Sequence, residues 1–233
     1  MLRVLISTSI ILFLLICCGE YRSKQIRATN SLSAQPPVLR SAGGDALNIA
    51  STKGVVVLNK FEKGDSVRFY NDDGSVWYEF SFFYDDSDGK FDFPNNDFRP
   101  FAFHPDYFLL VLRCTETSDR FLQVVVNEET GSKKYVKADD PVLKLQTWEE
   151  FVLKVFSVKF DKKANPILET PNGRVKTILI PGDANFRPVE TDGEWLKIRW
   201  DAAGQTGKRK QDATGWIRWK KAGILQVGFS YFA

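Results

Sequence analysis

The sequence predicts a mainly β protein, in which a β-rich (α+β) domain precedes a small β-barrel. Short apolar or alternating segments recur along the chain between clusters of Gly, Pro, Asn and Asp, a pattern typical of strands joined by turns. Only one segment carries a strong helix start signal, and strands do not alternate with long helical patterns. A parallel α/β sheet is therefore not expected.

The composition supports a folded core in one large or two small domains. The chain has 233 residues, of which 43% are hydrophobic. We expect a signal peptide (1–17), a flexible tether (18–50), a β-rich domain ending in a short helix (51–153) and the barrel (154–233). The formal net charge is only +3, so we expect no nucleic acid partner.

The strands of the β-rich domain are predicted from apolar and alternating runs at residues 55–58, 65–70, 76–84, 107–115, 121–127 and 133–137. Hairpin signals lie at Asn71 to Gly74 and at Glu128 to Gly131. The run 107–115 is nearly continuous in apolar residues, which predicts a central strand. Period-two alternation predicts one shared face for Val76, Tyr78, Phe80 and Phe82.

A single short helix is expected at the junction between the two domains. Thr147 is followed three residues later by Glu150, which is the spacing of a capping box. In such a box the threonine oxygen accepts from the later backbone amide, and the glutamate accepts from the threonine amide. The motif predicts a helix from Trp148 to about Leu153.

The C-terminal part reads as β-rich again, with strands predicted at residues 155–160, 176–180, 184–189, 195–200, 214–219 and 224–229. Several short strands at this spacing suggest a small barrel. In the strand 195–200, alternation places Leu196, Ile198 and Trp200 on one face and Trp195, Lys197 and Arg199 on the other.

This part also resembles a bacterial SH3-type domain over residues 155–225. Three stretches carry the resemblance: Asn165 to Gly173; Ile178 to Asp183 followed by Gly193 to Ile198; and Gly215-Trp216-Ile217. The resemblance implies a small barrel that binds cell-wall peptides or envelope proteins and implies no catalysis. The segment 202–213 is a longer insertion than is usual in the family, so the groove beside it is expected to differ.

The N-terminus resembles a bacterial lipoprotein signal. Arg3 precedes an apolar run over residues 4–17, which is shorter than the roughly 20 residues of a membrane span. The string Leu15-Ile16-Cys17-Cys18 fits the processing site of such signals, with Cys18 as the lipidated residue. The resemblance implies a lipid anchor in the cell envelope, facing the periplasm or the cell surface. Gly19 favours the outer membrane. An ordinary secretory signal is the alternative.

The candidate ligand contacts are aromatic and basic residues of the barrel. Trp195 and Lys197 on one strand, with Trp216 and Arg218 on another, suit a peptide ligand if they line a groove. The basic insertion adds Lys208, Arg209 and Lys210, which suit an anionic group. The alternatives are that Trp195 packs under a loop and that the cations form a solvated hairpin.

Catalytic and metal sites are not expected. Cys114 and His104 are the only residues that suggest a thiol hydrolase, but Cys114 falls in an apolar strand beside Phe108, Leu110 and Leu112, where a thiol is buried and unreactive. The acidic segment 85–92 does not fit the spacing of an EF-hand calcium loop, and one histidine with one mature thiol does not suit zinc.

Two functions remain open from the sequence. The first is a non-catalytic envelope lipoprotein whose barrel binds a peptide, a cell-wall fragment or a protein partner, without a cofactor. The second is a scaffold subunit of an envelope complex, with the barrel packed on its neighbour domain.

Overall fold

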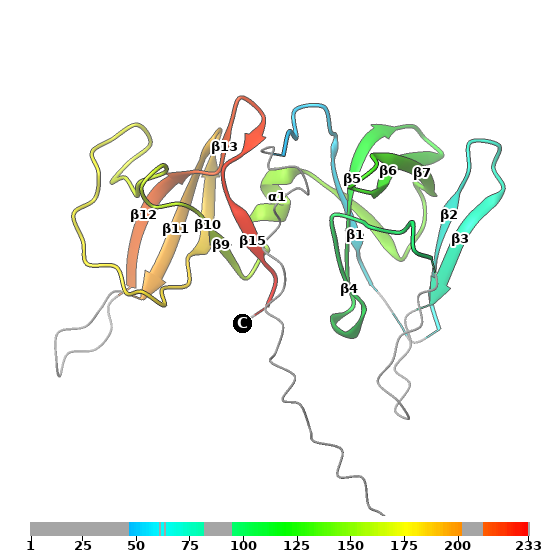
Figure 1. Cartoon of the computed structure of the whole chain (residues 1–233), viewed down its shortest axis with the longest axis horizontal. Coiled ribbons are helices and arrows are strands. Elements are labelled where there is room, and N and C mark those ends of the chain that lie inside the picture. The colour runs from blue at the N-terminus through cyan, green and yellow to red at the C-terminus, as the bar shows by residue number, and fades with distance from the viewer. Residues whose placement is uncertain (1–46, 61, 63, 82–94, 202–211, 233) are drawn as a thin grey trace, which may run out of the picture. The chain divides into compact units, whose positions relative to one another are not determined.

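The computed structural model describes residues 47–60, 62, 64–81, 95–201 and 212–232, all of which fall within one compact unit. The mainly β class is confirmed, and every pairing between the strands in this part of the chain is antiparallel (Figure 1). Among these residues, no helix reaches the length and apolarity that a bilayer crossing requires.

The first eight strands form one sheet in the order β3-β2-β7-β6-β5-β1-β8, with β4 paired to β5. Their bounds are β1 Gly54–Leu58, β2 Ser66–Tyr70, β3 Val76–Ser81, β4 Ala102–His104, β5 Leu109–Thr117, β6 Phe121–Asn127, β7 Ser132–Lys137 and β8 Leu143–Gln146. The strand predicted as central, now β5, lies between β6 and β1.

Both predicted hairpins form around glycines with positive φ. Between β2 and β3, Gly74 has φ 81° and its amide donates to the Asn71 carbonyl at 3.0 Å. Between β6 and β7, Gly131 has φ 72°, and the Asn127 side-chain oxygen accepts from the Glu129 amide at 3.0 Å. Glycine adopts this left-handed region without steric cost, so these turns follow directly from local sequence.

Two details of these strands differ from the prediction. Residues Pro105–Tyr107 form a 3-10 turn that ends on Phe108 with φ 50°, so β5 begins only at Leu109 and Phe108 is 41% exposed. Phe108 therefore does not share the buried face of Cys114. In β3, a register irregularity opposite Phe69 and Tyr70 leaves Val76 52% exposed, whereas Tyr78 and Phe80 join the core. Phe82 lies outside the described residues.

The C-terminal half contains one three-stranded sheet, β10-β11-β12, and two strand pairs, β13-β14 and β15-β9. The bounds are β9 Ser157–Lys159, β10 Arg187–Asp192, β11 Trp195–Asp201, β12 Asp212–Arg218, β13 Lys220–Lys221, β14 Ile224–Leu225 and β15 Gly228–Ser230. Isolated bridges join Val158 to Phe186 and Leu168 to Trp216. Closure into an SH3-type barrel stays a prediction.

The strand predicted at residues 176–180 does not form. An isolated bridge joins Leu168 to Val175, just before this segment, and within the segment Leu179 is 77% exposed. No described strand pairs with this segment, and the next strand, β10, starts only at Arg187. The strand predicted at residues 224–229 is divided into β14 and β15.

The predicted capping box is present at the start of α1, Trp148–Val152. The Thr147 hydroxyl accepts from the Glu150 amide at 3.1 Å, and the Glu150 carboxylate accepts from the Thr147 amide at 3.0 Å. Trp148, Phe151 and Val152 of this helix are buried, so the short helix is stabilised by packing as well as by its cap.

One of the two hydrophobic clusters draws members from both sides of the boundary predicted at 153/154, among them Val55, Trp148, Leu196 and Trp219. Residues 47–50, at the end of the predicted tether, also belong to this packed part. Ile49 is 4% exposed and its amide donates to the Gly223 carbonyl at 2.7 Å. The domain boundary itself stays a prediction.

Candidate binding face on strands β11 and β12

Strands β11 and β12 bring all four described candidate residues together. The antiparallel register places Trp195 opposite Arg218 and Lys197 opposite Trp216. The alternation predicted for β11 is confirmed, because Leu196, Ile198 and Trp200 are at most 2% exposed while Trp195 and Lys197 are only partly buried. We call the surface formed by Trp195, Lys197, Trp216 and Arg218 the indole face.

Each strand contributes one indole and one cation to this face. The Arg218 guanidinium carbon lies 4.6 Å from the centroid of the Trp195 ring, and the Lys197 ammonium lies 5.6 Å from that of Trp216. Both distances are within the range of cation–π attraction, which contributes about 0.5–1 kcal/mol at exposed sites. The two contacts are reciprocal across the strand pair, so each indole is paired with a cation of the other strand.

Carboxylates on neighbouring segments neutralise these cations. Lys197 lies 3.2 Å from the Glu190 carboxylate on β10, and Arg218 lies 3.8 Å from Glu194 in the β10–β11 turn. Arg199, which follows Lys197 on the same side of β11, lies 3.8 Å from an Asp212 oxygen. The sequence reasoning missed both glutamates. Antiparallel pairing of β10 with β11 is the signal that places Glu190 opposite Lys197.

The backbone beneath the face is held by residues far away in sequence. The Asn165 side chain accepts from the Arg218 amide at 3.0 Å and donates to the Arg218 carbonyl at 2.7 Å. Leu168 and Trp216 exchange two backbone hydrogen bonds, of 2.7 and 2.9 Å. Asn165 was part of the family resemblance, but its role as a clamp on Arg218 follows only from the structure.

Other candidate residues fall outside the described part of the chain. These are the basic insertion Lys208, Arg209 and Lys210, the proposed lipidation site Cys18, and the acidic segment 85–92.

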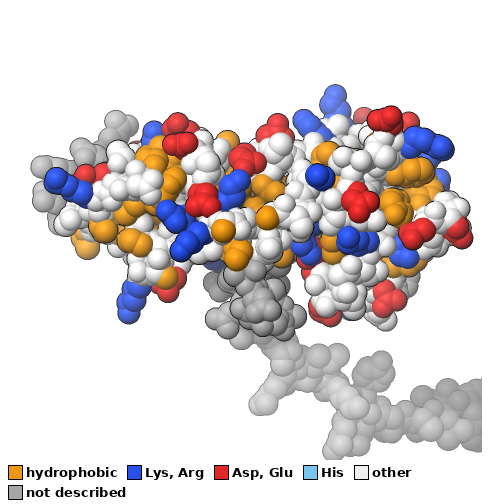
Figure 2. Space-filling view, turned by 90° about the horizontal axis from the view of Figure 1, so that it is seen from above, with side chains coloured by type: hydrophobic (Ala, Val, Ile, Leu, Met, Phe, Trp, Pro, Cys, Tyr) orange, Lys and Arg blue, Asp and Glu red, His pale blue; other side chains and the backbone are white. Residues whose placement is uncertain are grey.

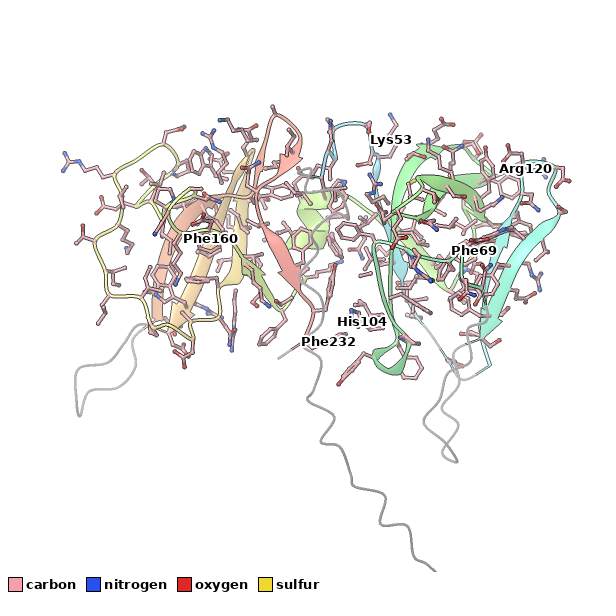
Figure 3. All side chains as sticks on the ribbon, viewed as in Figure 1. Lys53, Phe69, His104, Arg120, Phe160 and Phe232 are labelled. Atoms are coloured by element: carbon pink, nitrogen blue, oxygen red, sulfur yellow. The ribbon has the colours of Figure 1, made fainter. Side chains whose placement is uncertain are left out.

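Cys114 is buried in β5, as the sequence predicts, and its thiol donates to the Glu116 carbonyl at 3.3 Å. Burial raises the pKa of the Cys114 thiol to about 11. The reactive thiolate is therefore disfavoured at neutral pH. The His104 ring lies against the Phe232 ring, with centroids 5.3 Å apart (Figure 3).

Acidic, histidine and cysteine side chains do not gather into a metal-binding group anywhere in the described residues. Acidic and basic side chains are interspersed over the surface seen in Figure 2, with apolar side chains among them. This distribution agrees with the small net charge and gives no large field of one sign.

Comparisons of the chain with protein-family models, with curated proteins and with solved structures find no match.

Proposed function

We propose that this chain is a non-catalytic cell-envelope lipoprotein whose SH3-type C-terminal barrel binds a peptide, a cell-wall fragment or a protein partner through the indole face. The observation that carries the proposal is the pair of reciprocal cation–π contacts on β11 and β12. Trp195 and Trp216 are partly exposed, and each contact favours one orientation of its ring. Large rigid aromatics of this kind contribute contact area at a low cost in conformational entropy.

The charges of the face favour a peptide or protein over a strongly anionic glycan. Lys197 and Arg218 are already within 4 Å of Glu190 and Glu194, and these carboxylates weaken the attraction of either cation for an anionic ligand. A peptide or protein surface instead gains most from the apolar indole area and from hydrogen bonds at its edges.

Pull-down from an envelope extract, with the full chain as bait, tests the binding role. We expect Trp195→Ala and Trp216→Ala each to weaken capture by about 30-fold, as for interface hot spots worth roughly 2 kcal/mol. The matched control is Tyr107→Ala, which truncates a 60% exposed aromatic elsewhere on the chain. In a second pull-down, isolated peptidoglycan replaces the envelope extract. Equal capture by the wild type and both tryptophan variants, all folded, contradicts the indole face.

The lipid anchor is tested separately, by mass spectrometry of the protein purified from its native envelope. We expect the mature chain to begin at an acylated Cys18. A product that begins at Met1 without a lipid contradicts the anchor and leaves the binding face as a separate question.

A scaffold subunit is the second candidate, and one observation favours it. The larger hydrophobic cluster includes residues of both predicted domains, so the C-terminal half packs on its neighbour rather than hanging free. In this case cross-linking in intact cells yields one dominant protein partner, and its yield does not change with Trp195→Ala.

A further inference from the structure

A second aromatic surface lies on strands β2, β6 and β7 of the eight-stranded sheet, on the side opposite the hydrophobic cluster that contains Val124 and Val136. Phe121 stands between two tyrosines, with ring centroids 6.1 Å from Tyr70 and 6.4 Å from Tyr135, both edge to face. All three rings are partly buried, and none belongs to either hydrophobic cluster. The neighbours Leu122 and Val136 point to the core instead. We call this surface the outer aromatic face.

Polar groups continue the same face across the sheet. The Gln123 amide nitrogen donates to the Tyr135 hydroxyl at 3.0 Å, and the Thr115 hydroxyl donates to the Gln123 side-chain oxygen at 2.7 Å. These three side chains come from β7, β6 and β5, so they form a row perpendicular to the strands. The row presents amide and hydroxyl groups that both donate and accept hydrogen bonds.

Three cations border the rings. The Arg120 guanidinium, labelled in Figure 3, lies 5.7 Å from the Phe121 centroid, and the Lys137 ammonium lies 5.9 Å from that of Tyr70. Lys133 alternates with Tyr135 along β7 and is exposed. Within the described residues, none of these three cations has a carboxylate within 4 Å. The indole face differs, because its cations are paired.

Strand β6, which carries Phe121 and Gln123, is paired on both sides, with β5 and β7, and β7 meets β2 at the pair Tyr70–Tyr135. A peptide cannot extend the sheet by adding a strand to β6, since that mode needs an unpaired edge. A ligand on this face is therefore recognised by side chains alone: aromatic rings, hydrogen-bonding groups and unpaired cations.

We propose that the outer aromatic face binds an anionic polysaccharide. Sugar rings present polarised C–H groups, which are attracted to the negative faces of aromatic rings. Their hydroxyls match the amide and hydroxyl groups of Gln123 and Thr115. Carboxylates on the sugars complement Arg120, Lys133 and Lys137, whose charges no described acid neutralises. This site is separate from the indole face and does not depend on the role proposed for it.

Isothermal titration of the full chain in non-ionic detergent tests the proposal with three polymers. Polygalacturonate carries a carboxylate on every sugar, dextran is a neutral polysaccharide, and polyglutamate carries carboxylates without sugars. We expect binding of polygalacturonate, no binding of dextran, and at least fivefold weaker binding of polyglutamate, counted per carboxylate, as roughly 1 kcal/mol of aromatic and hydroxyl contacts predicts.

Matched charge variants locate the site. Lys133→Gln with Lys137→Gln is expected to weaken polygalacturonate binding about tenfold, because two charge-assisted contacts are lost. The control pair, Lys144→Gln with Lys159→Gln, removes the same charge from exposed positions on β8 and β9 and leaves the affinity unchanged. Phe121→Leu keeps the apolar bulk but removes the ring, and it is expected to weaken binding about fivefold.

Three outcomes overturn the proposal. The first is a wild-type chain that does not bind polygalacturonate. The second is an equal loss of affinity in both lysine pairs, which indicates attraction to the whole chain rather than to this face. The third is polyglutamate binding as tight as polygalacturonate binding, which assigns the surface to an acidic protein. Circular dichroism and thermal unfolding confirm that each variant is folded.

Discussion

Gly215→Ala tests how closely strand β12 lies against the segment that begins at Ile167. Gly215 is buried immediately before Trp216, and its backbone φ is not in the left-handed region. A Cβ added there overlaps the Cγ2 atom of Ile167, lies 3.1 Å from the Leu168 carbonyl oxygen and 3.5 Å from the Trp200 ring. The substitution is therefore expected to act through crowding, and not through backbone strain.

The stability loss expected for Gly215→Ala depends on whether the neighbours Ile167 and Leu168 can move away from the added Cβ. Leu168 cannot retreat without lengthening its two backbone hydrogen bonds to Trp216, and Ile167 is 4% exposed with a stiff β-branched side chain. Overpacking of such a site costs about 1–3 kcal/mol. Ile167→Ala removes the overlapping atom, and by itself costs about 2–5 kcal/mol through the cavity it leaves.

Urea unfolding of the full chain, followed by tryptophan fluorescence, measures both effects and their coupling. If the overlap with Ile167 is the cause, the double variant is more stable than the sum of the two single losses by about 1–2 kcal/mol, with an unchanged m-value. A Gly215→Ala variant within about 0.5 kcal/mol of the wild type, or losses that add strictly, refutes the close approach.

Three further predictions concern buried or capped positions. Gly54→Ala places a Cβ against a β8 backbone carbonyl at φ 139°, so we expect a loss above about 4 kcal/mol, seen as a low folded yield. With its pKa raised to about 11, Cys114 is expected to resist maleimide at pH 8 until urea unfolds the chain, as peptide mapping reports. In the unfolded chain the Cys114 thiol ionises at about pH 8.5, whereas in the folded chain it stays neutral up to about pH 11. Ionisation therefore favours the unfolded state between these two values, and the free energy of unfolding is expected to fall as the pH rises through this range. Thr147→Ala removes the cap on the Glu150 amide and is expected to lower the unfolding free energy by about 1 kcal/mol, whereas the exposed control Thr177→Ala leaves it unchanged.

The sequence was most informative where structure is decided within a few residues. The turn at Gly74, the capping box at Thr147 and the alternation in β11 each depend on neighbours in the chain, and each was predicted correctly. The burial of Cys114 was also predicted, because a nearly continuous apolar run is typical of a central strand that is covered on both faces. The four residues of the indole face were predicted, and the structure brings them together.

Features set by distant partners, or by a turn that interrupts an apolar run, were not predicted. Residues 176–180 have the composition of a strand, but no described strand pairs with them, and strand formation requires a partner. Phe108 looks like a core residue from its position in an apolar run, yet the turn begun by Pro105 places it in the left-handed region. The clamp from Asn165 to Arg218 spans 53 residues, and no local pattern signals it.

The two aromatic surfaces differ in whether their cations are paired with carboxylates, and this difference cannot be inferred from residue composition. Lys197 and Lys137 each lie near an aromatic ring, at 5.6 and 5.9 Å, and look equivalent in the sequence. Strand pairing places the Glu190 carboxylate of β10 opposite Lys197. Lys137 instead lies opposite Phe121, and no described carboxylate is within 4 Å of its ammonium group. A cation paired with a carboxylate adds little attraction for an anionic ligand, while a cation without such a partner is available to form a charge-assisted hydrogen bond with it. The same residue types therefore favour an apolar peptide or protein contact on one sheet and an anionic ligand on the other.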